Sequence, residues 1–290
     1  MEIIIKALIR VYSHPKKKKK IFLTTLRLIW WMINRHFLKL NVIVEMLPGA
    51  KLICDPKSSY GSLVFYNSLP EYAEQMFMYQ YVQANDKVVD VGAHIGSETV
   101  LLGSKLTGGR MYSFEPTPSV KPLLVANIGI NNLHDRVVVE DMAVSDHVGS
   151  TKFYLSTESE VNSLHNHEGS KAISIKTTTL DSYAKKLKID HIHLLKIDVE
   201  GHELAVISGS KSLLSKHNID VIVFEVNDQS GSCYQANLKA RELLTRSGYK
   251  LYLVSQDGVL TNYVHCPQVH NCIAISPKIK PSRMKNLRYE

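Results

Sequence analysis

The segment 87–96 constrains the fold of this chain more than any other stretch. It reads Lys-Val-Val-Asp-Val-Gly-Ala-His-Ile-Gly, a β-branched run that leads into two glycines. A strand that is apolar on both faces is typical of a parallel sheet with helices on both sides. Gly92 and Gly96 let the backbone bend sharply and approach a ligand, while a helix that begins near Ser97 points free N–H groups at the same place. The segment therefore predicts a parallel α/β sheet with a ligand site at this turn.

Two carboxylates at strand ends indicate the kind of ligand. The spacing Asp-x-Gly-x-x-x-Gly from Asp90 differs from the Gly-x-Gly-x-x-Gly of dinucleotide sites. Asp90 would repel a pyrophosphate but tolerate the ammonium and sulfonium charges of S-adenosylmethionine. The next predicted strand, 110–115, ends at Glu115, 25 residues after Asp90. A carboxylate there can accept hydrogen bonds from both ribose hydroxyls of an adenosine. The two acids together favour this ligand over a turn that binds nothing.

The charge distribution separates an arm from a nearly neutral body. The chain has 290 residues, 44% of them apolar, which is enough for one substantial α/β core. Its net charge is +8, but residues 1–40 hold ten Lys and Arg against the single acid Glu2, and the rest holds 25 basic and 26 acidic residues. No nucleic-acid partner is expected, because the basic residues lie outside the body. The predicted organisation is a basic arm at 1–40, a short strand region at 41–70, an α/β domain at 71–277 and a basic tail at 278–290.

The arm is predicted to contain an amphipathic helix over residues 21–40. Its apolar face includes Phe22, Leu26, Ile29, Trp30 and Ile33. The apolar run is too short to span a bilayer, and no small-residue cleavage site follows it. Five lysines at 16–20 precede the helix, so the arm fits the surface of an anionic membrane. A helix that packs on the α/β domain is the alternative.

The remaining elements alternate between strands and helices. Strands are predicted at 42–44, 51–54, 136–140, 193–198, 220–225, 249–254 and 271–275, helices at 71–83, 99–106, 116–130, 182–187 and 234–247, and a hairpin or pair of edge strands at 150–155 and 171–177. His165 and His167 fall between the last two strands and indicate a solvated loop. The four cysteines, Cys54, Cys233, Cys266 and Cys272, form no Cys-x-x-Cys pair. They are expected to be buried free thiols of a cytoplasmic protein, peripheral at the membrane if the arm binds there.

Acids end four of the predicted parallel strands. Asp198 and Glu225 end the fourth and fifth strands, as Asp90 and Glu115 end the first and second. The carboxyl ends of parallel strands meet at one edge of a sheet, where ligands of open α/β sheets bind. Asp141, followed by Met142, comes after the third strand and is the candidate for the adenine edge, although an Asp that only forms a turn is the alternative.

Four segments together resemble the FkbM-type methyltransferase family. They are 90–96, 114–116 (Phe-Glu-Pro), 143–146 (Ala-Val-Ser-Asp) and 195–203 (Leu-Lys-Ile-Asp-Val-Glu-Gly-His-Glu), and the similarity extends over about residues 70–226. His94 stands where the family usually has Asn, so the hydrogen bonding near the methionine end of the cofactor differs and a pH-dependent affinity becomes a hypothesis. The arm, with Ser-His-Pro at 13–15, also looks like a leader found in some members.

The resemblance implies a class I methyltransferase, Rossmann-like fold. Its sheet is mostly parallel and seven-stranded, with helices on both faces and an antiparallel last strand. It also implies S-adenosylmethionine as the methyl donor and a hydroxyl oxygen as the usual acceptor, on a sugar, a glycolipid, a polyketide or another secondary metabolite. The residues predicted to bind the cofactor are Asp90, Gly92, Ala93, His94, Gly96, Thr99, Glu115, Asp141, Met142 and Asp198.

Methyl transfer to a hydroxyl needs a group that takes its proton. Strand alternation places Lys196 and Asp198 on the same side. Asp198 is therefore the predicted base, and Lys196 would stabilise the developing alkoxide. Glu200, His202 and Glu225 are further candidates, although Glu200 and Glu203 equally fit charge compensation at a helix N-terminus. A metal site made of Asp198, Glu200, His202 and His193 has loose spacing, so no metal is expected.

Two other functions stay open at this point. An NAD-dependent oxidoreductase is disfavoured by the glycine spacing. A non-catalytic protein that binds an adenosine cofactor or acts as a membrane adaptor would bind the cofactor without turnover.

Overall fold

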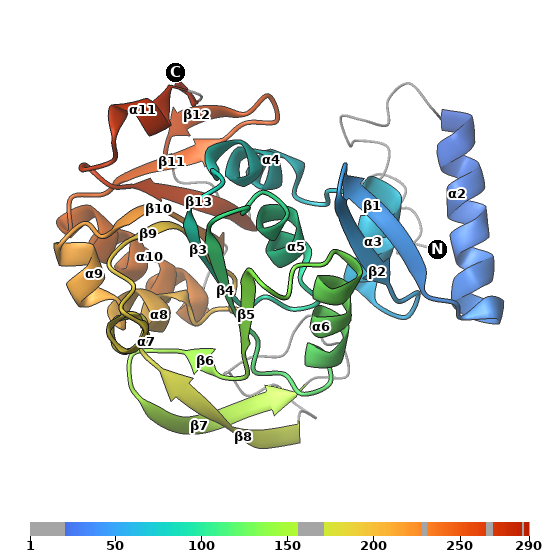
Figure 1. Ribbon diagram of the computed structural model, residues 1–290, viewed down its shortest axis with the longest axis horizontal. Helices are drawn as coiled ribbons and strands as arrows, with labels where there is room; N and C mark the ends of the chain where they lie inside the picture. The colour runs from blue at the N-terminus through green and yellow to red at the C-terminus, as the bar shows by residue number, and fades with distance from the viewer. Residues whose placement is uncertain (1–20, 156–170, 228–230, 265–268, 286, 290) are drawn as a thin grey trace. The chain divides into compact units, whose positions relative to one another are not determined.

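The computed structural model describes residues 21–155, 171–227, 231–264, 269–285 and 287–289. The lysines at 16–20, His165, His167 and Cys266 lie outside the described residues. The chain divides into two compact units, Met1–Tyr72 and Ala73–Glu290 (Figure 1). The cysteines whose side chains are described, Cys54 and Cys272, are free and buried as expected.

The smaller unit combines helices with a hairpin. Its elements are α2 (Ile21–Ile33), the π-helical turn η1 (Asn34–Leu38), β1 (Val42–Leu47), β2 (Ala50–Cys54) and α3 (Ser59–Asn67). β1 and β2 pair antiparallel. Trp31 of α2 stacks on Phe65 of α3, with 4.2 Å between ring centroids, and donates its indole N–H to Ser62 Oγ at 2.9 Å. Within the described residues no helix is long and apolar enough to cross a bilayer.

Helix α3 was not expected from the sequence, which indicated strands and turns there. The Ser58 side chain accepts a hydrogen bond from the Gly61 N–H and caps the helix. Burial of Trp31 against Phe65 then stabilises the helix from outside its own segment.

The larger unit is built on a nine-stranded sheet in the order β14-β12-β11-β13-β10-β9-β3-β4-β5. The strands are β3 (Lys87–Val91), β4 (Arg110–Phe114), β5 (Val137–Glu140), β9 (Ile192–Ile197), β10 (Ile219–Asn227), β11 (Lys250–Val254), β12 (Val259–Asn262), β13 (Val269–Ile275) and β14 (Arg288–Tyr289). Strands β5, β4, β3, β9 and β10 are parallel to one another, and β13 runs antiparallel between β10 and β11. The mostly parallel sheet with an antiparallel last strand is confirmed. β12 and β14 extend it beyond the expected seven strands.

Helices cover both faces of this sheet (Figure 1). One face carries α4 (Tyr72–Tyr81), α5 (Ser97–Gly103) and α6 (Lys121–Ile130), and the other carries α7 (Leu180–Leu187), α8 (Glu203–Ser208), α9 (Lys211–Ser215) and α10 (Gly231–Arg246). Val91, Phe114 and Ile197 belong to the core formed with α7 to α10. Because side chains alternate along a strand, Asp90 and Lys196 face the side of α4 and α5.

A second, three-stranded sheet follows β5. It consists of β6 (Ala143–Val144), β7 (Gly149–Leu155) and β8 (Lys171–Thr178) in the order β6-β8-β7. The predicted hairpin is confirmed, since β7 and β8 pair antiparallel. Ala143, Phe153 and Ile175 form a small core on this sheet. β6 begins three residues after the end of β5, so the small sheet extends from the carboxyl edge of the large one.

Candidate active site

The glycine turn after β3 holds the ends of three strands together. The backbone N–H groups of Gly92 and Ala93 both donate to Phe114 O at the end of β4, at 3.0 Å. On the other side, Asp198 donates its N–H to Val91 O at 2.9 Å. Gly92 has φ +86°, and a Cβ atom there would lie 1.8 Å from Asp198 O. Only glycine therefore allows β3 and the segment after β9 to come this close.

Gly96 closes the same turn at the start of α5. It has φ +91°, and a Cβ atom there would lie 2.5 Å from a methyl carbon of Leu124. The two glycines thus let Asp198 O and the Leu124 side chain pack directly against the turn.

Glu115 is fixed by backbone donors on either side. His94 donates its N–H to Glu115 Oε2 at 2.8 Å, and Thr117 donates to Oε1 at 2.8 Å. The carboxylate is 5% exposed. Each oxygen has a second lone pair, so Glu115 can still accept from a vicinal diol. His94 makes its contact with φ +48°, a left-handed conformation that Asn tolerates better than most residues do.

Asp90 is buried and has a partner on α5. Its Oδ2 accepts from the Thr99 hydroxyl at 2.7 Å, and Thr99 Oγ1 also lies 2.8 Å from Ser113 Oγ. Burial raises the pKa of Asp90 to about 7, and the charge of Glu98 adds to this, while the Thr99 hydrogen bond opposes it. Thr99, which is predicted to contact the cofactor, orients Asp90 through this hydrogen bond.

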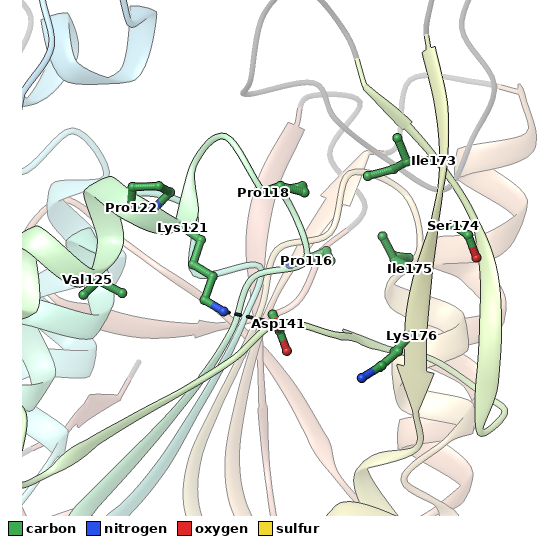
Figure 2. A pocket seen from close by; sticks show the side chains of 10 residues that line it. All are labelled: Pro116, Pro118, Lys121, Pro122, Val125, Asp141, Ile173, Ser174, Ile175 and Lys176. Atoms are coloured by element: carbon green, nitrogen blue, oxygen red, sulfur yellow. Dashed lines mark hydrogen bonds and ion pairs between the residues drawn. The ribbon is translucent and has the colours of Figure 1, made fainter.

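A pocket of about 700 Å³ lies between the loop after β4 and strand β8 (Figure 2). Pro116, Pro118 and Ile175 belong to its apolar wall. Asp141 lines it as well, but its side chain is 63% exposed and pairs with Lys121 at 3.1 Å. That hydrogen bond holds the pKa of Asp141 below its usual range.

Met142, the neighbour of Asp141, packs against the core of the larger unit. The structure thus brings Asp141 to a ligand-sized hollow and places Met142 among the core residues.

Lys196 and Asp198 form a pair at the end of β9. Lys196 is 2% exposed, whereas the Asp198 side chain is 35% exposed, and Lys196 Nζ lies 3.5 Å from Asp198 Oδ2. Nζ also donates to Asn271 Oδ1 on β13 at 3.0 Å. In register, Lys196 lies opposite Asp90 on the neighbouring strand. The predicted pair is therefore adjacent to the glycine turn and is held by a third strand.

Three further acids surround this pair. Glu203 accepts from the N–H groups of Val199 and Gly201, at 3.3 and 3.1 Å, and so orders the loop after Asp198. Although Glu200 reaches solvent, desolvation within the cluster raises its pKa to about 7, and the charges of Asp198 and Glu203 add to this. Burial, and then the charge of Asp198, raises the pKa of Glu225 above its usual range. Glu203 thus orders the loop before α8, while burial and nearby carboxylates raise the pKa values of Glu200 and Glu225.

His202 is the N-cap residue of α8. Its Nε2 lies 3.1 Å from Ser145 Oγ, just after β6. This contact joins the segments 143–146 and 195–203, which lie far apart in the sequence.

The four residues of the metal alternative are not brought together. His193 is the second residue of β9, five positions before Asp198, or roughly 16 Å along a strand. Its Nδ1 accepts the Lys87 N–H at 3.0 Å. His193 therefore lies at the opposite edge of the sheet from Asp198.

In the part of the chain that the structure describes, one group of side chains has metal-like spacing: His191, His193 and Asp220, with ligand atoms within 4.8 Å. Because His193 Nδ1 accepts a hydrogen bond, Nε2 carries the proton and has no lone pair for a metal. Arg283 also lies there, with 2.5 Å to Asp86 and 3.7 Å to Asp220. We interpret this group as an ion-pair network that attaches α11 (Pro281–Met284) to the sheet.

Several polar residues of the site were missed from the sequence. Gln75, fully buried in α4, donates to Glu98 Oε1 at 2.7 Å, and Ser97 donates to the same carboxylate. Asn271, on β13, is the third polar residue that was missed, after Gln75 and Ser97. The available signal was a polar residue at a buried position of a helix or strand, but the sequence alone does not indicate what it contacts.

A family model for the methyltransferase FkbM domain matches residues 90–251, more than half of the chain. The chain belongs to the FkbM methyltransferase family. Residues 90–251 thus form an S-adenosylmethionine-dependent methyltransferase domain, as the resemblance implied. An NAD-dependent oxidoreductase is thereby set aside. The FkbM match begins at Asp90 and includes Glu115, Lys196 and Asp198.

Two curated relatives of this FkbM protein are methyltransferases by name. The hexuronic acid methyltransferase AglP of Haloferax volcanii is 26% identical over 140 residues, 48% of this chain and 56% of AglP. The 2-O-methyltransferase NoeI of Sinorhizobium fredii is 26% identical over 174 residues, 54% of this chain and 69% of NoeI. The chain thus spans little more than half the length of AglP. Among solved structures, the FkbM methyltransferase of Methylobacillus flagellatus KT is 16% identical, with 75% of this chain and 55% of that chain covered and a TM-score of 0.43.

Proposed function

We propose that this enzyme methylates a hydroxyl oxygen of a sugar, carried by a glycan, a glycolipid or a secondary metabolite. The observation that supports this most is the Lys196–Asp198 pair beside the glycine turn, because a hydroxyl acceptor needs a base. The name of AglP, which contains a hexuronic acid, supports a sugar acceptor, and the name of NoeI, a 2-O-methyltransferase, supports an oxygen acceptor. The free buried thiols fit a reducing, cytoplasmic compartment.

The residues around the turn fit an adenosine cofactor. The turn is tightly packed at Gly92 and Gly96, and Glu115 beside it keeps lone pairs for the ribose hydroxyls. Asp90, 2% exposed, offers a negative charge to a cationic group. Asp141 lines the pocket in Figure 2 and follows the parallel strand β5, so we assign both to the adenine edge. When bound, S-adenosylmethionine supplies a methyl carbon activated by the adjacent sulfonium.

The protein residues position the acceptor and move its proton. Asp198 is open to solvent on one side and takes the hydroxyl proton as the oxygen bonds to the methyl carbon and the carbon–sulfur bond breaks. Buried Lys196 stabilises the negative charge that develops on the oxygen. Asn271 is a positioning residue, since it holds Lys196 Nζ at 3.0 Å. We assign His202 the role of anchoring the loop through Ser145, and Glu200 that of binding acceptor hydroxyls.

The charge of the cluster limits which sugar fits. Asp198, Glu200 and Glu225 surround one lysine, and both glutamates have raised pKa values because of burial and mutual repulsion. A uronate carboxylate would add a further negative charge at this place. A neutral or amino sugar is therefore the favoured acceptor.

The assay that tests this function follows labelled methyl transfer into fractionated polysaccharides and lipids. Label is expected in a neutral or basic glycan fraction, and base-stable methyl ether linkages would identify oxygen as the acceptor. Label found in protein or nucleic acid would contradict a sugar acceptor. Label in a uronate fraction would contradict the prediction that the acceptor sugar is neutral or basic.

Glu115→Gln is expected to weaken S-adenosylmethionine binding by about 1–3 kcal/mol, because two hydrogen bonds from the ribose would lose their charged acceptor. Isothermal titration calorimetry measures the change. Glu242→Gln, on the exposed surface of α10, is the matched control and should bind as the wild type does. Equal affinities for the two variants would remove Glu115 from the ribose site.

Cofactor affinity is expected to rise with pH through about 7, because the pKa of Asp90 is raised to about 7 by its burial. Below that pH the carboxyl is protonated and neutral, and above it the carboxylate attracts the cation. Calorimetry in buffers of different ionisation enthalpy should show that binding releases a proton on the acid side.

His94 would give a pH dependence of the same sign, since its protonated ring repels a cation. His94→Asn should retain the dependence, and Asp90→Asn should remove it and bind weakly throughout. The reverse pattern would assign the titration to His94.

A further inference from the structure

Helix α2 and the turn after it present apolar side chains on two opposite faces. Leu28 and Trp31 are buried, and Trp31 packs on α3. The opposite side carries exposed apolar residues at helical spacing. These residues are Leu26, Ile29, Ile33, Phe37 and Leu40, each 45% exposed or more, and we call them the outer stripe. Trp30 is 42% exposed and lies at the edge of the stripe, where its ring also stacks on Phe65 at 5.7 Å between centroids. A contiguous exposed patch of this kind marks an interaction surface.

The turn that ends the outer stripe is fixed by a buried side chain. Asn34 is fully buried, and its side chain forms hydrogen bonds with both backbone polar groups of Leu40. Its Nδ2 donates to Leu40 O at 2.9 Å, and its Oδ1 accepts the Leu40 N–H at 3.0 Å. Phe37 lies between these two residues and is 79% exposed. The backbone is therefore ordered around an aromatic side chain that has solvent on most sides.

The charge around the outer stripe indicates what covers it. No acidic residue occurs between Glu2 and Glu45, whereas residues 1–40 hold ten Lys and Arg. Arg27 and Arg35 are exposed but reach toward α3, where they donate to Phe65 O and Ser62 Oγ, and Lys39 is exposed in the turn after α2. A second copy of the chain would bring two strongly positive segments together. An anionic lipid surface complements both the charge and the apolar side chains.

We propose that the outer stripe binds the surface of an anionic phospholipid bilayer, with α2 lying in the headgroup region and not across the membrane. The inner face of α2 stays on α3, so binding needs no rearrangement of the smaller unit. The outer stripe shares no residue with the methyl transfer site. A lipid-linked acceptor in the same bilayer would meet the enzyme at a raised local concentration.

The test uses the full-length chain and sedimentation with vesicles. Binding is expected to vesicles of equal parts phosphatidylcholine and phosphatidylglycerol, to weaken as salt is added, and to be lost on phosphatidylcholine alone. Phe37→Ser and Ile29→Ser should each weaken binding at least about tenfold, through loss of buried apolar area. Val148→Ser, which changes an exposed valine of the larger unit, is the matched control and should bind as the wild type does.

Tryptophan fluorescence gives a second measurement, because the chain has only two tryptophans. Trp31 is 1% exposed and Trp30 is 42% exposed. Emission should shift to shorter wavelength with anionic vesicles in the wild type and not in Trp30→Phe. Equal vesicle binding by Phe37→Ser and Val148→Ser would overturn the proposal. The proposal would also be overturned if the wild type did not bind vesicles and formed a dimer that Phe37→Ser dissociates. A second copy of the chain would then cover the outer stripe. Unchanged cofactor affinity shows that each variant is folded.

Discussion

Asp198→Asn is expected to lower kcat for methyl transfer by about 10²–10⁴-fold, with cofactor affinity unchanged. The substitution keeps the size of the side chain and removes the group that takes the hydroxyl proton. Lys196 keeps its hydrogen bond to Asn271, so the lysine stays in place and the loss reports on the base. Labelled methyl transfer into the active glycan fraction measures kcat, and calorimetry measures cofactor binding.

The control for this experiment is Asp190→Asn, an exposed aspartate between α7 and β9, which should keep full activity. If Asp198→Asn retained more than about a tenth of the wild-type kcat, the loss would be smaller than the contribution of a catalytic base. Glu225→Gln would then be the variant to measure, because the raised pKa of Glu225 also suits a base. Asn271→Leu is expected to have a different effect. Lys196 would lose the contact that fixes its position, so kcat would reach half of its maximum at a higher pH than in the wild type.

Gly92→Ala is expected to destabilise the protein by about 3–5 kcal/mol, from a strained left-handed backbone together with overpacking. The new methyl carbon would lie 1.8 Å from Asp198 O, so the end of β9 must move away from the turn. The same movement should abolish cofactor binding in whatever fraction stays folded. Urea unfolding midpoints and calorimetry measure the two effects.

Gly258→Ala separates strain from close approach. Gly258 has φ +75°, but nothing lies within 4 Å of its Cβ position. The free energy of unfolding of this variant should fall by only about 1 kcal/mol, and the variant should bind the cofactor as the wild type does. If both variants were equally stable, the close packing of the glycine turn on Asp198 would have no part in the fold.

Patterns within one segment predicted most elements of the larger unit. The β-branched run at 87–91 and the alternation at 150–155 and 171–177 specify strands through periods that a single segment contains. The direction of β13 was implied by the family motifs, which the four matching segments carry in order. By contrast, α3 is stabilised by the contact of Trp31 with Phe65, and nothing within 59–67 shows that contact.

The same distinction holds for the candidate site. The sequence indicated where the strands before Glu115 and Asp198 end. Because the carboxyl ends of parallel strands meet at one edge of a sheet, the two residues were expected to lie near each other. The sequence predicted that Thr99 contacts the cofactor, but it did not indicate the hydrogen bond of the Thr99 hydroxyl to Asp90. Asn271 lies 75 residues from Lys196, and neither neighbourhood in the sequence points to the other.

The sequence by itself determined the family, the cofactor class and the acids at the carboxyl ends of the strands, because each is encoded in a short contiguous motif. The tertiary structure alone decided which side chains share a hydrogen bond, which apolar face of α2 is buried, and that His193 lies at the far edge of the sheet from Asp198. Those outcomes depend on contacts between distant segments. Burial and pKa are set by everything packed around a group, not by its neighbours in the chain.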